Sequence, residues 1–213
     1  MCGRFALSST VKELPSLLLE GMDSEHQDRY APRPLICPGE PLLALRRDQC
    51  TQEASLMLWG LIPSWSKDPS HGPRPFNARA ETVMDRPTFR GSWRHRRCLI
   101  PATSFFEKGQ RIRRIDRRPF WLAGLWERWQ GSDGSEVDTC TILTTTPNAL
   151  VKPLHSRMPV VIPDGLEEAW TTSADGFQLR VLEPLLSPWD PMDWEVVDAV
   201  GNGQLSLFSA MDG

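Results

Sequence analysis

Residues 97–108, with the sequence RCLIPATSFFEK, contain two short apolar or aromatic runs, 97–101 and 104–108. Runs of this kind between turn-forming residues are typical of β-strands. The chain has further runs of the same type at 41–45, 54–60, 120–126, 138–145 and 158–162. We therefore expect a protein built largely from short strands.

Helices are expected to be short. Ser8–Glu20 begins with a Ser-Ser-Thr cap and carries four leucine or valine residues at helical spacing, but Pro15 should break or kink this helix. A second helix is expected around 163–170 and a third over Gly176–Leu182. Strands mixed with short helices in irregular order indicate an α+β fold.

Length and composition favour one domain. The chain has 213 residues, of which 40% are hydrophobic, and this is enough for one substantial core. No apolar run approaches the roughly 20 residues that span a bilayer, and the first residues lack the pattern of a signal peptide. We expect a cytoplasmic protein without a membrane association.

The cysteines point to one unusual position. The five cysteines are Cys2, Cys37, Cys50, Cys98 and Cys140, and they contain no C-x-x-C pair and no matching histidine spacing. Neither a disulfide framework nor a metal site is therefore expected, and no cofactor is implied. The four internal cysteines are expected to be small buried hydrophobes. Cys2 differs because it becomes the N-terminal residue once Met1 is removed.

The charge is unevenly distributed along the chain. The net charge is −3, but residues 86–118 contain eleven basic and two acidic residues, a net charge of +9, so the rest carries −12. An arginine-rich segment suits the capture of a polyanion such as DNA, because each neutralised phosphate releases counterions. The alternative is a solvated surface of salt bridges.

An N-terminal cysteine offers two nucleophiles on adjacent carbons. Its α-amine can condense with an aldehyde to an imine, and its thiol can then close on the imine carbon to give a five-membered thiazolidine. The α-amine has an ordinary pKa of about 7.7–8.0, so a useful fraction is neutral at cellular pH. The second step is intramolecular and correspondingly fast.

Several motifs give Cys2 a context. They are MCGRFA at 1–6, WGLIPSW at 59–65, NARAET at 77–82, RCLIPA at 97–102, FFE at 105–107, AGLWE at 123–127, TILTT at 141–145 and LHSRMP at 154–159. In this order they closely resemble the SRAP family, the SOS-response-associated peptidases that shield abasic sites. The resemblance implies a partly open, barrel-like core of mixed or antiparallel sheets with short flanking helices, in a domain spanning residues 1–200.

The resemblance also implies a function and a set of roles. Cys2 would crosslink to the aldehyde of an abasic site in single-stranded DNA, with an associated self-processing peptidase activity and a weak lyase activity. Asn77 would orient the Cys2 amine or the sugar, Glu107 would transfer protons, and His155 would promote opening of the closed sugar. Without the family, a salt bridge for Glu107 and a structural role for His155 are the alternatives.

The basic candidates for DNA phosphates are Arg4, Arg79, Arg96, Arg97 and Lys108. Lys108 marks a departure from the family, whose members usually have Trp after the glutamate and Asp-Gly where this chain has Thr103-Ser104. Loss of a stacking Trp would cost about 1–3 kcal/mol of DNA affinity. The tryptophans at 59, 65, 121 and 126 lie in or beside apolar strands and are expected to belong to the core.

The C-terminal tail, 201–213, contains a second motif. Gln204, Leu205, Leu207 and Phe208 resemble the peptide with which many bacterial proteins dock on the DNA sliding clamp, where two apolar anchors enter a pocket. Such docking would place the protein at replicating DNA, in the nucleoid. The alternative is a terminal strand that packs its leucines on the core.

Two other functions compete with abasic-site capture. One is an N-terminal-nucleophile amidohydrolase or protease, in which the Cys2 thiol attacks a carbonyl and His155 or Glu107 acts as base. The other is a clamp-tethered, non-enzymatic single-strand binder for which Cys2 is incidental. The amidohydrolase needs no basic patch, and the non-enzymatic binder would not change when Cys2 is replaced.

Overall fold

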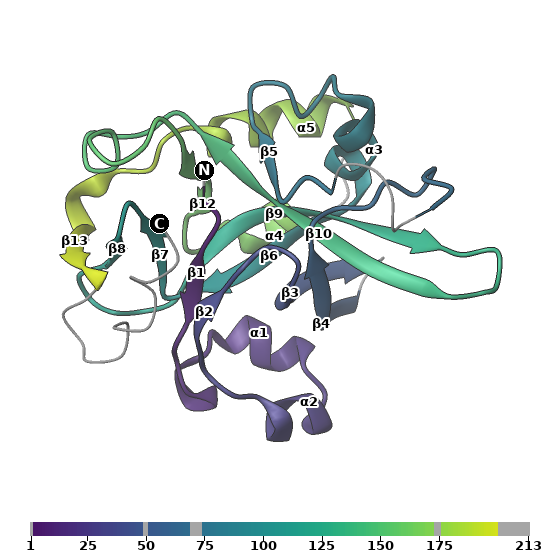
Figure 1. The fold of residues 1–213 in the computed structure, drawn as a ribbon, viewed down its shortest axis with the longest axis horizontal. Helices are drawn as coiled ribbons and strands as arrows, with labels where there is room; N and C mark the ends of the chain where they lie inside the picture. The colour runs from purple at the N-terminus through teal and green to yellow at the C-terminus, as the bar shows by residue number, and fades with distance from the viewer. Residues whose placement is uncertain (1, 49–50, 69–73, 173–175, 200–213) are drawn as a thin grey trace, which may run out of the picture.

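The computed structural model describes residues 2–48, 51–68, 74–172 and 176–199. Its centre is a closed barrel of five strands (Figure 1). The barrel strands are β3 (Pro41–Asp48), β4 (Thr51–Trp59), β6 (Arg97–Ala102), β9 (Phe120–Gln130) and β10 (Glu136–Thr145). Neighbours are antiparallel except for β10 and β4, and the ring closes because β10 pairs with both β9 and β4. The α+β fold with a barrel-like core is thus confirmed.

A second sheet lies against the barrel, on the left in Figure 1. Its order is β13 (Trp194–Asp198), β8 (Gln110–Arg114), β7 (Ser104–Glu107), β1 (Phe5–Leu7) and β2 (Arg33–Ile36). The chain passes from the barrel strand β6 into β7 with only Thr103 between them. The stretch 97–108 therefore joins the two sheets, and it fixes where the second sheet sits relative to the barrel.

Three short strands extend the edges of the barrel. They are β5 (Asn77–Arg79), β11 (Met158–Pro159) and β12 (Val161–Ile162). β5 runs parallel to β10 and pairs Asn77 with Ile142, whereas β11 pairs with the end of β10 at Thr144 and Thr145. The segments before and after β10 in the chain thus come together at one end of this strand.

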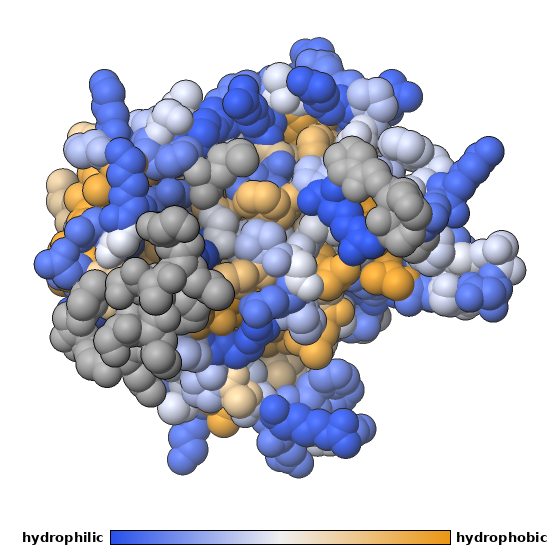
Figure 2. Space-filling model, viewed as in Figure 1, coloured by the Kyte–Doolittle hydropathy of each residue, from blue (hydrophilic) through white to orange (hydrophobic). Residues whose placement is uncertain are grey.

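The helices are short, as the proline content predicts. They are η1 (Val11–Glu13), α1 (Ser16–Gly21), α2 (Ser24–Arg29), α3 (Pro87–His95), α4 (Glu167–Thr171), α5 (Gly176–Leu182), η2 (Glu183–Leu186) and η3 (Pro191–Asp193). The helix expected over Ser8–Glu20 is split by Pro15, which is the N-cap of α1. Hydrophilic residues cover most of the face drawn in Figure 2, with smaller apolar areas between them. Within the described ranges, no helix is long and apolar enough to cross a membrane.

Gly124 marks a close approach between two barrel strands. It lies on β9 opposite Cys98 of β6, and a Cβ at this position would lie 2.7 Å from the Cys98 sulfur and 2.9 Å from Ile100 Cδ1. Cys98 and Ile100 are both fully buried. A side chain at Gly124 therefore has no space inside the barrel wall.

We predict that Gly124→Ala lowers the free energy of unfolding by about 1–3 kcal/mol, the usual cost of overpacking a core. The same substitution in a Cys98→Ala background should cost less, because the nearest clashing atom is gone. Urea unfolding of the two single variants and the double variant measures this coupling. Strictly additive effects would contradict the assigned clash.

Candidate active site

Cys2 lies directly before β1 and is fully buried. The side-chain Nδ2 of Asn77 donates a hydrogen bond to the backbone carbonyl of Cys2 over 2.8 Å. The backbone N–H of Arg4 acts on the Cys2 thiol and favours its charged form. The N-terminal segment is thus fixed in the interior of the protein at a defined position beside β5.

The N-terminal segment meets β5 because residues beside both of them pack on Trp59. Its fully buried ring makes edge contacts with Phe5 on one side and with Phe76 on the other, at centroid distances of 5.3 and 6.0 Å. Its Nε1 also donates to the Phe76 carbonyl over 2.7 Å. Because Phe5 begins β1 and Phe76 precedes Asn77, this one indole brings Cys2 and Asn77 together.

Glu107 reaches the same site from the second sheet. It ends β7, which pairs with β1 at Phe5 and Phe105, and its side chain is only 6% exposed. Burial, together with the negative charge of Glu107, raises the pKa of the Cys2 thiol to about 12. The thiol is therefore held in its neutral form in the unprocessed chain.

His155 is fixed at the end of β10 by its neighbour Arg157. The backbone N–H of Arg157 donates to Nδ1 of His155 over 3.0 Å. The Arg157 guanidinium forms two hydrogen bonds with Glu81, at 2.5 and 2.8 Å, and it also donates to the Thr144 carbonyl. These bonds lower the pKa of Glu81. Since Thr144 pairs with Arg79 of β5, the His155 segment is tied to the strand that carries Asn77.

Three of the expected DNA contacts are exposed around this site. Arg4 follows Cys2 by two residues, Arg79 ends β5, and Lys108 follows Glu107. Lys108 and Gly109 both have positive φ angles, 47° and 75°, and form the two-residue turn between β7 and β8. The turn conformation fits a type I′ hairpin, which usually places glycine or asparagine where this chain has lysine.

The other two expected DNA contacts do not lie at this site. Arg97 is 2% exposed, and its guanidinium donates to the backbone carbonyls of Trp93, Arg94, Trp170 and Thr172. It therefore ties α3 and α4 to the barrel, and phosphate has no access to it. Arg96 forms an ion pair with the buried Glu127. Both lie at the start of β6, about 17 Å along the strand from its end at Ala102.

The basic run 86–118 does not form a single patch. Its first part lies on α3 and its last part on β8, which are on opposite sides of the molecule in Figure 1. Several of its arginines are in ion pairs, including Arg113 with Glu195 and Arg114 with Asp116. The salt-bridge interpretation holds for these arginines, whereas capture of a polyanion by the run stays a prediction. The clamp-like residues Gln204, Leu205, Leu207 and Phe208 lie outside the described residues.

Trp65 was expected in the core, but its side chain is 69% exposed. Trp59 and Trp121 are buried as expected, and Trp126 is half-buried. The signal for Trp65 was present in the sequence, because Pro63 and Ser64 precede it and end the strand pattern. An exposed indole is a platform for stacking.

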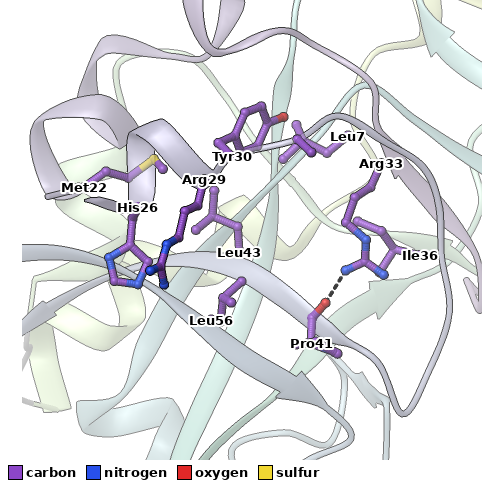
Figure 3. Close-up of a pocket in the computed structure, with 11 residues that line it drawn as sticks. Leu7, Met22, His26, Arg29, Tyr30, Arg33, Ile36, Pro41, Leu43 and Leu56 are labelled. Carbon is purple, nitrogen blue, oxygen red and sulfur yellow. Dashed lines mark hydrogen bonds between the residues drawn. The ribbon is translucent and has the colours of Figure 1, made fainter. Parts of the chain in front are cut away.

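A separate apolar pocket is lined by none of the candidate site residues. It has a volume of about 370 Å³ and lies between α1, α2 and the first strands (Figure 3). Leu7, Met22 and Leu43 supply apolar walls, while the Tyr30 ring covers one side. The chemistry-bearing residues therefore gather at Cys2 and not at this cavity.

Known proteins resemble this chain over almost its entire length. A family model described as SOS response associated peptidase (SRAP) matches residues 1–202. The abasic site processing protein YoqW of Bacillus subtilis is 35% identical over 207 residues, covering 92% of this chain and 90% of that protein. The abasic site processing protein YedK of Escherichia coli is 29% identical and covers 95% of each. A crystal structure of a protein from Bacteroides thetaiotaomicron superposes with a TM-score of 0.79 at 25% identity, covering 92% of this chain and 91% of that one.

The electrostatic coupling between Glu107 and Cys2 gives a pH prediction. In Glu107→Gln, the pKa of the Cys2 thiol should fall, because the nearby negative charge that opposes the thiolate is removed. The ¹³Cβ chemical shift of labelled Cys2, followed from about pH 8 up to and beyond the pKa of about 12, reports this fall. Glu136→Gln, at an exposed site on β10, is the control and should change nothing. Titration of Cys2 near the ordinary value in the unsubstituted chain would contradict the burial.

Proposed function

Because this chain belongs to the SOS response associated peptidase (SRAP) family, we propose that Cys2 captures the aldehyde of abasic sites in single-stranded DNA. Relatives that match more than nine-tenths of the chain are named abasic site processing proteins, which supports a role in handling abasic DNA damage. One observation carries the finer proposal. Cys2 is buried with its carbonyl held by Asn77 and its thiol under the influence of Glu107.

The proposed reaction begins with hydrolysis of the peptide bond between Met1 and Cys2, by the chain itself or by an aminopeptidase. The freed amine adds to the aldehyde carbon of the opened sugar, and loss of one water gives an imine. The thiol then adds to the imine carbon, its proton passes to nitrogen, and the thiazolidine ring closes. No oxidant, reductant or metal is required by this sequence of steps.

Glu107 is the proposed proton carrier. Its carboxylate would accept the proton that the amine loses as the C–N bond forms, and it would return this proton to the hydroxyl that leaves as water. The Glu107 carboxylate is only 6% exposed and acts electrostatically on the Cys2 thiol, so it lies close to the reacting residue. The same carboxylate would accept a proton from the water that attacks the Met1 carbonyl.

Asn77 is the proposed orienting residue. Its Nδ2 binds the Cys2 carbonyl, while its Oδ1 is buried and has no hydrogen bond partner among the described residues. A buried acceptor without a donor costs about 1–3 kcal/mol. An N–H of the freed Cys2 amine is a donor of the right kind for Oδ1. This pairing would fix the direction from which the amine attacks.

His155 is the proposed catalyst of sugar opening. An abasic deoxyribose is mostly a cyclic hemiacetal, and it reacts only after the C1′ hydroxyl loses a proton and the ring oxygen gains one. A histidine exchanges protons near neutral pH. The hydrogen bond from the Arg157 backbone N–H to Nδ1 fixes the orientation of the His155 ring for this exchange.

Several exposed residues suit a single strand. Arg4, Arg79 and Lys108 offer cations to flanking phosphates, and Trp65 offers a surface for a base. A buried Cys2 is reached only when the strand bends into the pocket with no opposing strand in the way. The imine intermediate also permits β-elimination of the 3′ phosphate, which would give a weak lyase activity.

The thiol pKa argues against the amidohydrolase alternative. A cysteine hydrolase attacks with a thiolate, so its reactive thiol has a lowered pKa. Here, in the chain that still carries Met1, burial and the charge of Glu107 raise the pKa of the Cys2 thiol to about 12. In thiazolidine formation the neutral amine attacks first, and the thiol has only to add to an activated imine carbon.

The C-terminal tail, residues 201–213, is a separate part of the proposal. The family match ends at residue 202, which supports a domain over 1–200 followed by a tail over 201–213. Docking of this tail on a sliding clamp, through Leu207 and Phe208, stays a prediction from the sequence. A location at the nucleoid would follow from it.

We expect the Met1-processed protein to form a band of reduced mobility on a denaturing gel with a single-stranded oligonucleotide that carries one abasic site. Cys2→Ala and Cys2→Ser both keep the α-amine but lack the thiol, so neither should form a stable band, and both should form one only after borohydride reduction traps the imine. A band with an intact oligonucleotide, or none from a protein whose N-terminal cysteine is confirmed by mass spectrometry, would overturn the proposal.

We also expect Trp65→Ala to weaken binding of single-stranded DNA by about 1–3 kcal/mol, the usual value of one stacked base. Fluorescence anisotropy with a labelled oligonucleotide measures the dissociation constant. Leu56→Ala is the matched control, because Leu56 is 57% exposed but lies on β4 in the wall of the apolar pocket. Equal effects of the two substitutions would contradict a specific stacking role.

A further inference from the structure

A polar pocket of about 190 Å³ lies at the far end of β1 from Cys2. Its walls come from the residues after β1, from the junction of β6 and β7, and from β8 and its following turn. The residues used below are Ser8, Thr103, Ser104, Arg111, Arg113 and Arg117. None of the residues assigned to abasic-site chemistry lines this pocket.

Strand alternation directs two of the arginines toward the same side. Ile112 of β8 is fully buried and pairs with the buried Phe105, so its neighbours Arg111 and Arg113 lie on the opposite face of the sheet. The Arg111 guanidinium lies over the Phe106 ring, 5.2 Å from its centroid. The second sheet therefore has an apolar face toward the core and an arginine face toward the pocket.

The pocket retains positive charge after its ion pairs are counted. Arg113 and Arg117 share one carboxylate oxygen of Glu195, each at 2.9 Å. Glu13, which also lines the pocket, already accepts two hydrogen bonds from Thr10. Among the described residues, Arg111 has no carboxylate partner, and its buried Nε has no hydrogen bond partner.

The opposite wall of the pocket carries hydroxyl residues, which do not neutralise the positive charge. Thr103 and Ser104 are both neutral, so their wall adds no carboxylate beside the arginines. Thr103 Oγ1 accepts from the Ser8 backbone N–H over 3.0 Å, which fixes the wall. Ser104 is 3% exposed. The pocket thus combines arginines with hydroxyl groups, the donors that bind phosphate.

We propose that this pocket binds a phosphate group. A volume of about 190 Å³ exceeds the roughly 30 Å³ share of one water several-fold, so a phosphate fits inside. The two sources of such a group are an internucleotide phosphate of the bound strand and free inorganic phosphate. The first source rests on the proposed function, whereas the second does not.

The distance between the pocket and Cys2 sets how long a bound DNA strand must be to reach both. Ser8 follows Cys2 by six residues and Ser104 precedes Glu107 by three, so the pocket lies about 10–20 Å from Cys2. A stacked strand advances about 3.4 Å per nucleotide, so the phosphate would lie about three to six nucleotides from the abasic site, and fewer in a stretched strand. The pocket would then define the length of single strand that the protein occupies.

Two variants test the pocket. Arg111→Gln removes the unpaired cation, and Thr103→Asp adds a carboxylate while all arginines remain. Arg29→Gln, an exposed arginine on α2, and Thr103→Asn are the matched controls. Dissociation constants are measured by anisotropy with abasic oligonucleotides whose 5′ or 3′ arms have two, four, six or eight nucleotides. In parallel, thermal unfolding is measured in sodium phosphate and in sodium chloride of equal ionic strength.

We expect both variants to weaken binding of long-armed oligonucleotides at least several-fold and to make the salt dependence less steep by about 0.7. Short-armed oligonucleotides and the crosslinking yield at saturation should not change. If the variants lose only the stabilisation by phosphate, the pocket stands and its ligand is free phosphate. The proposal is overturned if neither variant differs from its control in DNA affinity, salt dependence or phosphate stabilisation. Failure of the unsubstituted protein to crosslink would reject the proposed function alone, since the phosphate measurement is independent of it.

Discussion

The indole of Trp59 is the contact on which the candidate site depends. It ends the barrel strand β4 and is fully buried, and it separates Phe5 of β1 from Phe76, which precedes β5. Its hydrogen bond to the Phe76 carbonyl also fixes the position of the residue that precedes β5. This contact therefore holds the N-terminal strand β1 against the segment that enters β5, in addition to the direct connection of the two sheets through 97–108. Without it, the Asn77 Nδ2 and the Cys2 carbonyl oxygen would not be held 2.8 Å apart.

Burial has opposite effects on the reactivity of the thiol and of the α-amine of an N-terminal cysteine. A thiol in a desolvated site next to a carboxylate stays protonated, and this is the state of Cys2 in the unprocessed chain. Desolvation pushes an amine in the same surroundings toward its neutral, reactive form, whereas the Glu107 carboxylate favours the ammonium form and can accept its proton as the reaction proceeds. The same enclosure that makes the thiol a poor first nucleophile therefore prepares the amine. The order of events in the proposed reaction follows from this difference.

The sequence predicts the barrel well, because strands such as β6 are continuous apolar runs that are buried on both faces, while β4 alternates between buried and more exposed residues toward its end. It predicts β1, β5 and β13 poorly, since three to five residues are too few for a periodic pattern. Arginines show the clearest limit. Arg97 and Arg111 are alike in the sequence, yet the first donates to backbone carbonyls inside the protein and the second faces a pocket. Only the positions of α3, α4 and Phe106 distinguish them, and these positions depend on contacts between distant segments.

Strand β7 links the two polar sites of the molecule. It is four residues long, with Ser104 at the arginine-lined pocket and Glu107 beside Cys2. Both of its neighbours, β1 and β8, are fixed to it by backbone hydrogen bonds, so the separation of the two sites is set by the rise of a strand and not by a flexible loop. A rigid spacing of this kind matches a ligand with a regular repeat. A nucleic acid strand has such a repeat in its phosphates, whereas a compact small molecule does not extend over this distance.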